Sequence, residues 1–206
     1  MTTTTTALPD TASAVLAQAR QQRAVADRAE ARQLQLAVHW AVLHPAESLA
    51  AAETHRGAVL GERGVPIAGP GAPLVAEFAV AEFAAALGVG TETGKYYLGQ
   101  AVELRYRLPR TWDAVIAGGL PAWRARRVAA ATISAALSAE AAAFVDRHVA
   151  PCAHRIRPAQ LDRLVDEAVA RFMPEKAEGP PPGCRWSPLH DRPRPGLVRR
   201  DQPVLG

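Results

Sequence analysis

Basic side chains are concentrated in one stretch of this 206-residue chain. Residues 95–127 hold seven basic and two acidic residues, so this window carries a formal charge of +5 while the whole chain carries +4. Guanidinium groups neutralise phosphates and release counterions, which is the electrostatic basis of nucleic-acid binding, although a charge cluster is also typical of an ordinary solvated surface. The window predicts DNA-phosphate contacts by Lys95, Arg105, Arg107, Arg110, Arg124, Arg126 and Arg127.

The glycine-rich stretch LGVGTETGKYY, residues 87–97, does not fit a nucleotide-binding loop. A phosphate-binding loop requires a glycine five residues before Gly94 and a hydroxyl after the lysine, but Val89 and Tyr96 occupy these positions. A dinucleotide-binding loop must follow a β-strand, whereas Gly88 follows a helical pattern. The stretch instead indicates a helix stop followed by a turn.

This turn has some features of a helix-turn-helix unit, in which a small residue lets two helices approach closely. Apolar, small and glycine residues fall at the expected places, although Gly94 stands where a buried aliphatic side chain is usual. A helical hairpin with these spacings is also common in protein cores. The matching positions are Phe83, Ala84, Leu87, Gly88, Val89 and Tyr97.

Residues for catalysis or metal binding form no recognisable pattern. Cys152 and Cys184 are far apart without C-x-x-C spacing, and Pro151 interrupts the one close set of metal-ligand types, formed by Cys152 with His148 and His154. We therefore expect no catalytic residue, no metal and no cofactor. No apolar run is long enough for a membrane span, and the cysteine usage suits a reducing compartment, so we expect a cytoplasmic protein without a membrane partner.

The elements that position the basic residues are predicted to be helices. Alanine is abundant and aromatic residues make up only 5% of the chain, which favours an all-α fold. Helical spacing predicts a multi-helix domain over residues 10–174, after a disordered Thr-rich lead at 1–9. Residues 175–206 are rich in Pro, Arg and Gly without apolar periodicity, which predicts an unstructured C-terminal tail.

A long N-terminal helix is expected from Asp10, as the cap, to about Leu43. Its apolar seam is predicted to consist of Ala19, Ala26, Ala29, Leu36, Trp40 and Leu43. A short helix should follow between Pro45 and Gly57, and then a Gly/Pro loop at 61–73. The Ala-rich seam gives a second possibility for the protein, self-association through this helix.

Further helices are expected from Leu74 to Leu87 and from Glu92 to Arg107, the second capped by Thr91. Its buried side should consist of Tyr97, Ala101, Leu104 and Leu108. A break at Pro109 should precede a short helix capped by Thr111 and stopped by Gly118 and Gly119. The remaining helices are expected to begin at Pro121, Ser138 and Pro158, the last one burying Leu161, Leu164, Val165, Ala168 and Phe172.

Three segments, ELRYRLPRTW, AGGLPAWRARR and RPAQLDRLVDEAVARF, resemble the actinobacterial 13E12-repeat family. The resemblance covers roughly residues 10–178. Its members share a helical domain of unknown function, DUF222, that usually precedes an HNH endonuclease domain. The resemblance therefore implies a helical, DNA-binding accessory domain.

The chain departs from the pattern of an HNH nuclease, because it contains no Asn, no paired histidines and no C-x-x-C motif. No nuclease residue can therefore be transferred to it, and we expect a non-catalytic chain truncated before the HNH part. Double-stranded DNA is the expected partner. A helical module for protein–protein interaction or self-association, forming a homo-oligomer through the N-terminal helix, is the alternative.

Overall fold

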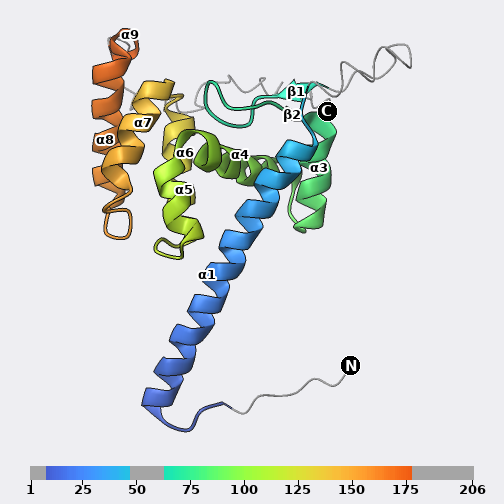
Figure 1. Cartoon of the computed structure of the whole chain (residues 1–206), viewed down its shortest axis with the longest axis vertical. Coiled ribbons are helices and arrows are strands. Elements are labelled where there is room, and N and C mark those ends of the chain that lie inside the picture. The colour runs from blue at the N-terminus through green and yellow to red at the C-terminus, as the bar shows by residue number, and fades with distance from the viewer. Residues whose placement is uncertain (1–7, 47–62, 178–206) are drawn as a thin grey trace, which may run out of the picture.

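The computed structural model describes residues 8–46 and 63–177, and it confirms the all-α fold with a long N-terminal helix (Figure 1). Two two-residue strands are the only extended elements in these two ranges. The helices are α1 (Ala12–Leu43), α3 (Glu77–Ala86), α4 (Thr91–Arg107), α5 (Pro109–Ile116), α6 (Ala122–Ser134), α7 (Ala139–Val149), α8 (Pro158–Phe172) and α9 (Pro174–Ala177), and the strands are β1 (Gly64–Val65) and β2 (Val75–Ala76).

Helix α4 lies at the centre of the bundle, between α1 and α3 on one side and α6 on the other (Figure 1). The predicted buried side of α4 is confirmed, because Tyr97, Ala101, Leu104 and the following Leu108 are all buried. Burying an apolar side chain of this size contributes about 1.5–3 kcal/mol. The packing of α4 therefore fixes the positions of the helices that carry the basic residues.

The turn between α3 and α4 is confirmed as a glycine-terminated helical hairpin. Gly88 has φ +69°, and its N–H donates to Ala85 O while the N–H of Val89 donates to Ala84 O. This is the Schellman arrangement, which favours glycine at the left-handed position. The helices then approach so closely that a side chain at Gly94 would lie 2.8 Å from Ala84 Cα. Glycine at this position therefore permits the close contact.

The predicted seam of α1 is wrong. The buried positions are Leu34, Ala37, Val38 and Ala41, at the three-four spacing of a face turned away from the predicted seam. Alanines at the other end of the helix carry too little apolar surface to decide which side packs against the bundle. Leu36, a predicted seam residue, is exposed.

Two further details of α1 differ from expectation. The cap is Thr11, whose hydroxyl accepts from the N–H of Ala14, and not Asp10. Trp40 is partly buried and its Nε1 donates to Ala79 O at 2.8 Å, so it packs within the chain. The buried positions of α1 all lie toward its C-terminal end, and Figure 1 shows the N-terminal part extending beyond the bundle.

The segment before α3 was expected to be a loop at 61–73 and a helix from Leu74. It contains instead a small antiparallel pair in which β1 aligns Gly64 with Ala76 and Val65 with Val75 of β2, so the helix begins later, at Glu77. Buried Val75 and Ala76 lie in the core, and the extended pairing satisfies their backbone. The predicted helix from Pro45 to Gly57 falls mostly on residues 47–62, outside the described residues.

Pro121, Ser138 and Pro158 mark helix starts as expected, whereas Pro109, expected as a break before a helix capped by Thr111, is itself the first residue of α5. Pro109 and Pro158 are the first residues of α5 and α8, α6 begins directly after Pro121, and the hydroxyl of Ser138 accepts from the N–H of Ala141 at the start of α7. The helical part continues through α9 to Ala177, beyond the expected boundary at 174. The remainder of the expected tail, 178–206, lies outside the described residues.

Two predicted caps are wrong. Thr91 lies inside α4, whose cap is Gly90, and Thr111 lies inside α5. The start of α5 is capped from another helix: the buried carboxylate of Asp146 on α7 accepts from the N–H groups of Arg110 and Thr111 at 2.9 Å. It also accepts from the Thr111 hydroxyl at 2.7 Å. A negative charge at a helix N-terminus also interacts favourably with the helix dipole.

Within the two described ranges, no helix has the length and apolar character needed to cross a membrane.

Candidate nucleic-acid interface

Helix α6 presents its three arginines on two different sides. Residues 124 and 127 are three positions apart and share one face of the helix, whereas residue 126 is turned away from them. Arg124 and Arg127 point toward the loop between α7 and α8, and Arg126 points toward α4. The three arginines that α6 contributes to the basic window are therefore divided between two sides of this helix.

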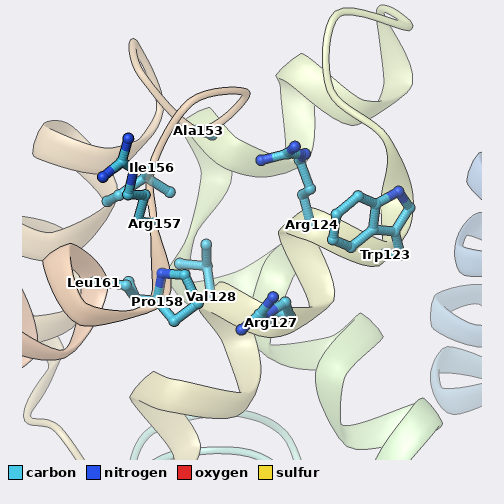
Figure 2. Close-up of a pocket in the computed structure, with 9 residues that line it drawn as sticks. All are labelled: Trp123, Arg124, Arg127, Val128, Ala153, Ile156, Arg157, Pro158 and Leu161. Atoms are coloured by element: carbon cyan, nitrogen blue, oxygen red, sulfur yellow. The ribbon is translucent and has the colours of Figure 1, made fainter.

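The first side of α6 forms a pocket with the start of α8, shown in Figure 2. Arg124 and Arg127 lie on α6, and Arg157 is the residue that directly precedes α8. We call this site the three-arginine pocket. No acidic residue lines this pocket, and no ion pair involves these three arginines within the described residues. The remaining lining residues are Trp123, Val128, Ala153, Ile156, Pro158 and Leu161. Positive charge in this pocket is therefore available to an external anion.

Trp123 stands at the edge of the same pocket and is 41% exposed. The guanidinium carbon of Arg124 lies 4.7 Å from the centre of its ring, which is within the range of a cation–π contact. The contact orders the Arg124 side chain without neutralising its charge. In Figure 2 the guanidinium extends from α6 into the space below the loop that carries Ala153.

The other side of α6 faces a groove that contains Lys95. This groove lies between the 66–68 segment, α4 and α6, and it includes Tyr96 and Gln100. Arg126 is partly occupied by internal contacts, because its Nε donates to Gln100 Oε1 at 2.7 Å. Lys95 and Arg126 therefore approach the same region of α4, on the opposite side of α6 from the three-arginine pocket.

The guanidinium of Arg126 also lies 4.4 Å over the ring of Tyr97. Burial raises the pKa of Tyr97 to about 12 from its ordinary value of 10.0, while the positive charge of Arg126 opposes this rise. The phenol is therefore neutral at physiological pH, and the Arg126 charge is stacked on an uncharged ring.

Arg105 and Arg110 are exposed and lie away from the three-arginine pocket. Arg105 is in the last turn of α4, where a cation interacts favourably with the helix dipole. Arg110 is in the first turn of α5 and lines a depression together with Arg147, Glu140 and Asp146. The two acidic residues reduce the positive potential at this place.

Arg107 was predicted to contact phosphate, but it is buried and belongs to the core. Its Nη1 donates to both carboxylate oxygens of Glu103, at 2.8 and 3.1 Å, and its Nη2 donates to Leu137 O at 2.6 Å and Ser138 O at 3.0 Å. Only Nε has no partner within the described residues. A guanidinium held in this way is not available to DNA, so we exclude Arg107 from the candidate interface.

Glu103 completes this buried network. Its carboxylate is fully buried and also accepts from the N–H of Gly69 at 2.9 Å and from the hydroxyl of Thr132 at 2.8 Å. The network therefore connects α4 with α6 and with the segment before β2. The i to i+4 spacing of Glu103 and Arg107 is the sequence signal that could have indicated an ion pair.

Arg157 is the cationic residue that the sequence analysis missed. It lies 30 positions after Arg127, outside the basic window, and only the fold brings it beside α6. Its position directly before Pro158 places it at the start of a helix, where the positive end of the dipole reinforces its charge.

These features define an all-α domain with a central helix and an uncompensated cationic pocket on its outer surface. The model of the family described as "Domain of unknown function (DUF222)" matches residues 46–181. The chain therefore belongs to the DUF222 family. The match begins after α1 and includes every later helix. No curated protein and no solved structure matches the chain.

Proposed function

We propose that this DUF222 domain binds double-stranded DNA through contacts to the phosphate backbone. The observation that supports this function best is the pocket lined by Arg124, Arg127 and Arg157, which has no acidic residue in its lining. Structural arginines are usually paired when they are buried, as Arg107 is. Unpaired arginines gathered from two helices instead have the chemistry of a phosphate site.

The interface includes exposed or half-buried cations on both sides of this pocket. Lys95 and Arg126 lie across α6 from it, and Arg105 and Arg110 add positive charge farther away. Phosphate contacts position a protein on DNA without reading bases, so we assign no sequence preference. The domain acts as a positioning module and we assign no catalytic residue to it.

The α3–α4 hairpin contributes less to this function than a helix-turn-helix reader would. Most of α4 is packed against α1, α3 and α6, so it has no free face along its full length. Its exposed residues are Thr91, Glu92 and Thr93 in the first turn, Tyr96 in the next turn, and Arg105 and Tyr106 near the C-terminal end. A recognition helix needs a face that can enter the major groove. The cationic face of α6 is therefore the better candidate for contact with DNA.

The test compares two double variants with the same loss of charge. R124A/R127A removes two arginines of the pocket, and R20A/R28A removes two exposed arginines of α1. Fluorescence anisotropy with a labelled random-sequence duplex measures their affinities at one low salt concentration. We expect R124A/R127A to bind at least tenfold more weakly than R20A/R28A. Equal weakening would show that total charge, and not the pocket, determines binding.

A second candidate function is self-association through α1. The observation that favours it is the exposure of apolar side chains along this helix, with Val15 47%, Leu16 56%, Val25 46% and Leu36 50% exposed. The occupant would be α1 of a second copy, as in a helical pair. Light scattering over a range of protein concentrations tests it. A mass that doubles, and that falls back to one chain in V25E/L36E, whose positions share one face of α1, would support self-association.

A further inference from the structure

The three-arginine pocket is a small depression in the surface. Its enclosed volume is about 20 Å³, well below the range for ligand pockets, and it opens to solvent. It is bounded by α6 on one side and by the α7–α8 loop and the start of α8 on the other (Figure 2). A depression this small can seat a single phosphate group at its mouth, and it is too narrow for the side of a duplex.

The charge of the pocket matches a dianion better than a monoanion. An internal phosphodiester carries one negative charge, whereas a terminal phosphate monoester carries nearly two at neutral pH and has three terminal oxygens. Three guanidinium groups present fifteen N–H donors, and each can hold two oxygens of a phosphate. The positive end of the α8 dipole, at Arg157 and Pro158, adds to the same field.

We propose that this pocket binds the 5′-terminal phosphate of a DNA strand, so that the domain recognises DNA ends. The proposal rests on the proposed function, because Arg124, Arg127 and Arg157 belong to both. It adds that Arg157, opposite the face of α6, makes the pocket prefer a terminal phosphate.

Trp123 provides the second element of an end-binding site. Its ring lies at the rim and is 41% exposed, beside Arg124. A base at the end of a strand has one uncovered face, and stacking on an aromatic ring contributes to binding without sequence preference. A base inside a duplex has no such face. The pairing of a phosphate pocket with an exposed indole therefore suits a strand end.

Arg157 can close the pocket by a side-chain rotation. Its side chain is exposed, and in Figure 2 its guanidinium lies beside Ile156 and is turned away from Arg124, so the rotation would bring it toward α6. Its backbone is fixed, because its N–H donates to Gln160 Oε1 at 2.9 Å and its carbonyl accepts from the N–H groups of Gln160 and Leu161. A phosphate in the pocket would then be held between α6 and α8.

The experiment uses the full chain and two short blunt duplexes of identical sequence, one with 5′-phosphates and one with 5′-hydroxyls, labelled internally. Anisotropy should give about tenfold tighter binding of the phosphorylated duplex, as expected for additional charge-assisted hydrogen bonds. R157A should weaken binding of both duplexes, and of the phosphorylated duplex more, so that the ratio falls to about one. R163A, which removes an exposed arginine from α8, is the matched control and should keep the ratio. R157K should retain part of it, because lysine keeps the charge without the two-pronged geometry.

The outcomes separate the two proposals. If the unmodified protein binds both duplexes equally, end recognition is overturned while DNA binding stands. If neither duplex binds at low salt, the proposed function is overturned as well. If a nucleoside 5′-monophosphate at the concentration of duplex ends competes fully, the pocket takes free nucleotides and the assignment to DNA ends is wrong. Circular dichroism of R157A confirms that its fold is retained.

Discussion

Replacing Arg107 by methionine tests whether this arginine belongs to the core or to the interface. The substitution keeps most of the side-chain volume but removes the donors to Glu103 and to the carbonyl of Leu137. The fully buried carboxylate of Glu103 then keeps only two hydrogen-bond donors, the N–H of Gly69 and the hydroxyl of Thr132. Breaking a buried ion pair from one side costs about 3–5 kcal/mol of unfolding free energy.

The effect should be measurable against the stability of the whole domain, for which about 5–15 kcal/mol is typical. Urea denaturation followed by circular dichroism gives the difference, and the melting temperature should fall by about 6–20 °C. Arg105→Met is the matched control, because Arg105 lies in the same last turn of α4 and is exposed. It should change the unfolding free energy by less than about 0.5 kcal/mol.

A double-mutant cycle tests the cause of the loss. Glu103→Gln removes the charge that Arg107→Met leaves unpaired, so the combined variant should be less destabilised than the sum of the single variants by about 1–3 kcal/mol. If Arg107→Met costs less than about 1 kcal/mol, or if the two substitutions are additive, the buried network around Glu103 and Arg107 does not stabilise the domain as we describe.

Three further predictions concern positions in the described part of the chain. Asp146→Ala should lower the unfolding free energy by about 2–4 kcal/mol, because Thr111 loses both of its bonds to the carboxylate; urea denaturation measures this, and an unchanged midpoint would contradict the cap. Ala136→Gly should raise the unfolding free energy by about 0.5–1 kcal/mol, because Ala136 has φ +43°, a backbone conformation that favours glycine. Ala130→Gly, within α6, should lower the unfolding free energy by about 1 kcal/mol. Urea denaturation that gives the same sign for both would refute the argument. The pKa of Tyr97 is raised in the folded state, so the stabilisation by its neutral phenol is complete below pH 10 and is lost as pH rises through about 12. The difference in melting temperature between the wild type and Tyr97→Phe should therefore change only in that pH range.

Local signals in the sequence predicted most helix boundaries. Some residues break, start or end a helix through their own backbone or side chain, so these roles can be inferred without knowledge of the fold. They are Pro109, Pro158, Ser138 and Gly88. The caps that depend on another helix could not be predicted. Thr111 has the residue type of a cap, but Asp146, 35 positions later, occupies that role.

The buried face of α1 and the composition of the candidate interface depend on packing in the same way. Leu34 and Leu36 are the same residue type, so the sequence cannot tell which of them is buried. The packing of α1 against the bundle, mainly against α4, buries Leu34 and leaves Leu36 exposed. Charge alone could not separate buried Arg107 from exposed Arg105, two residues away. Arg157 was missed because a window of sequence cannot include a residue that only the fold brings close.

The salt dependence of DNA binding by the unmodified protein tests the central claim most directly. Affinity for a random-sequence duplex, measured by anisotropy at several salt concentrations, gives a slope of log affinity against log salt of about −0.9 for each phosphate contacted. The account predicts a slope of about −2.7 or steeper, since Arg124, Arg127 and Arg157 each contact phosphate, and a shallower slope for R124A/R127A. Absence of binding at low salt, or an affinity independent of salt, would contradict DNA binding by this domain.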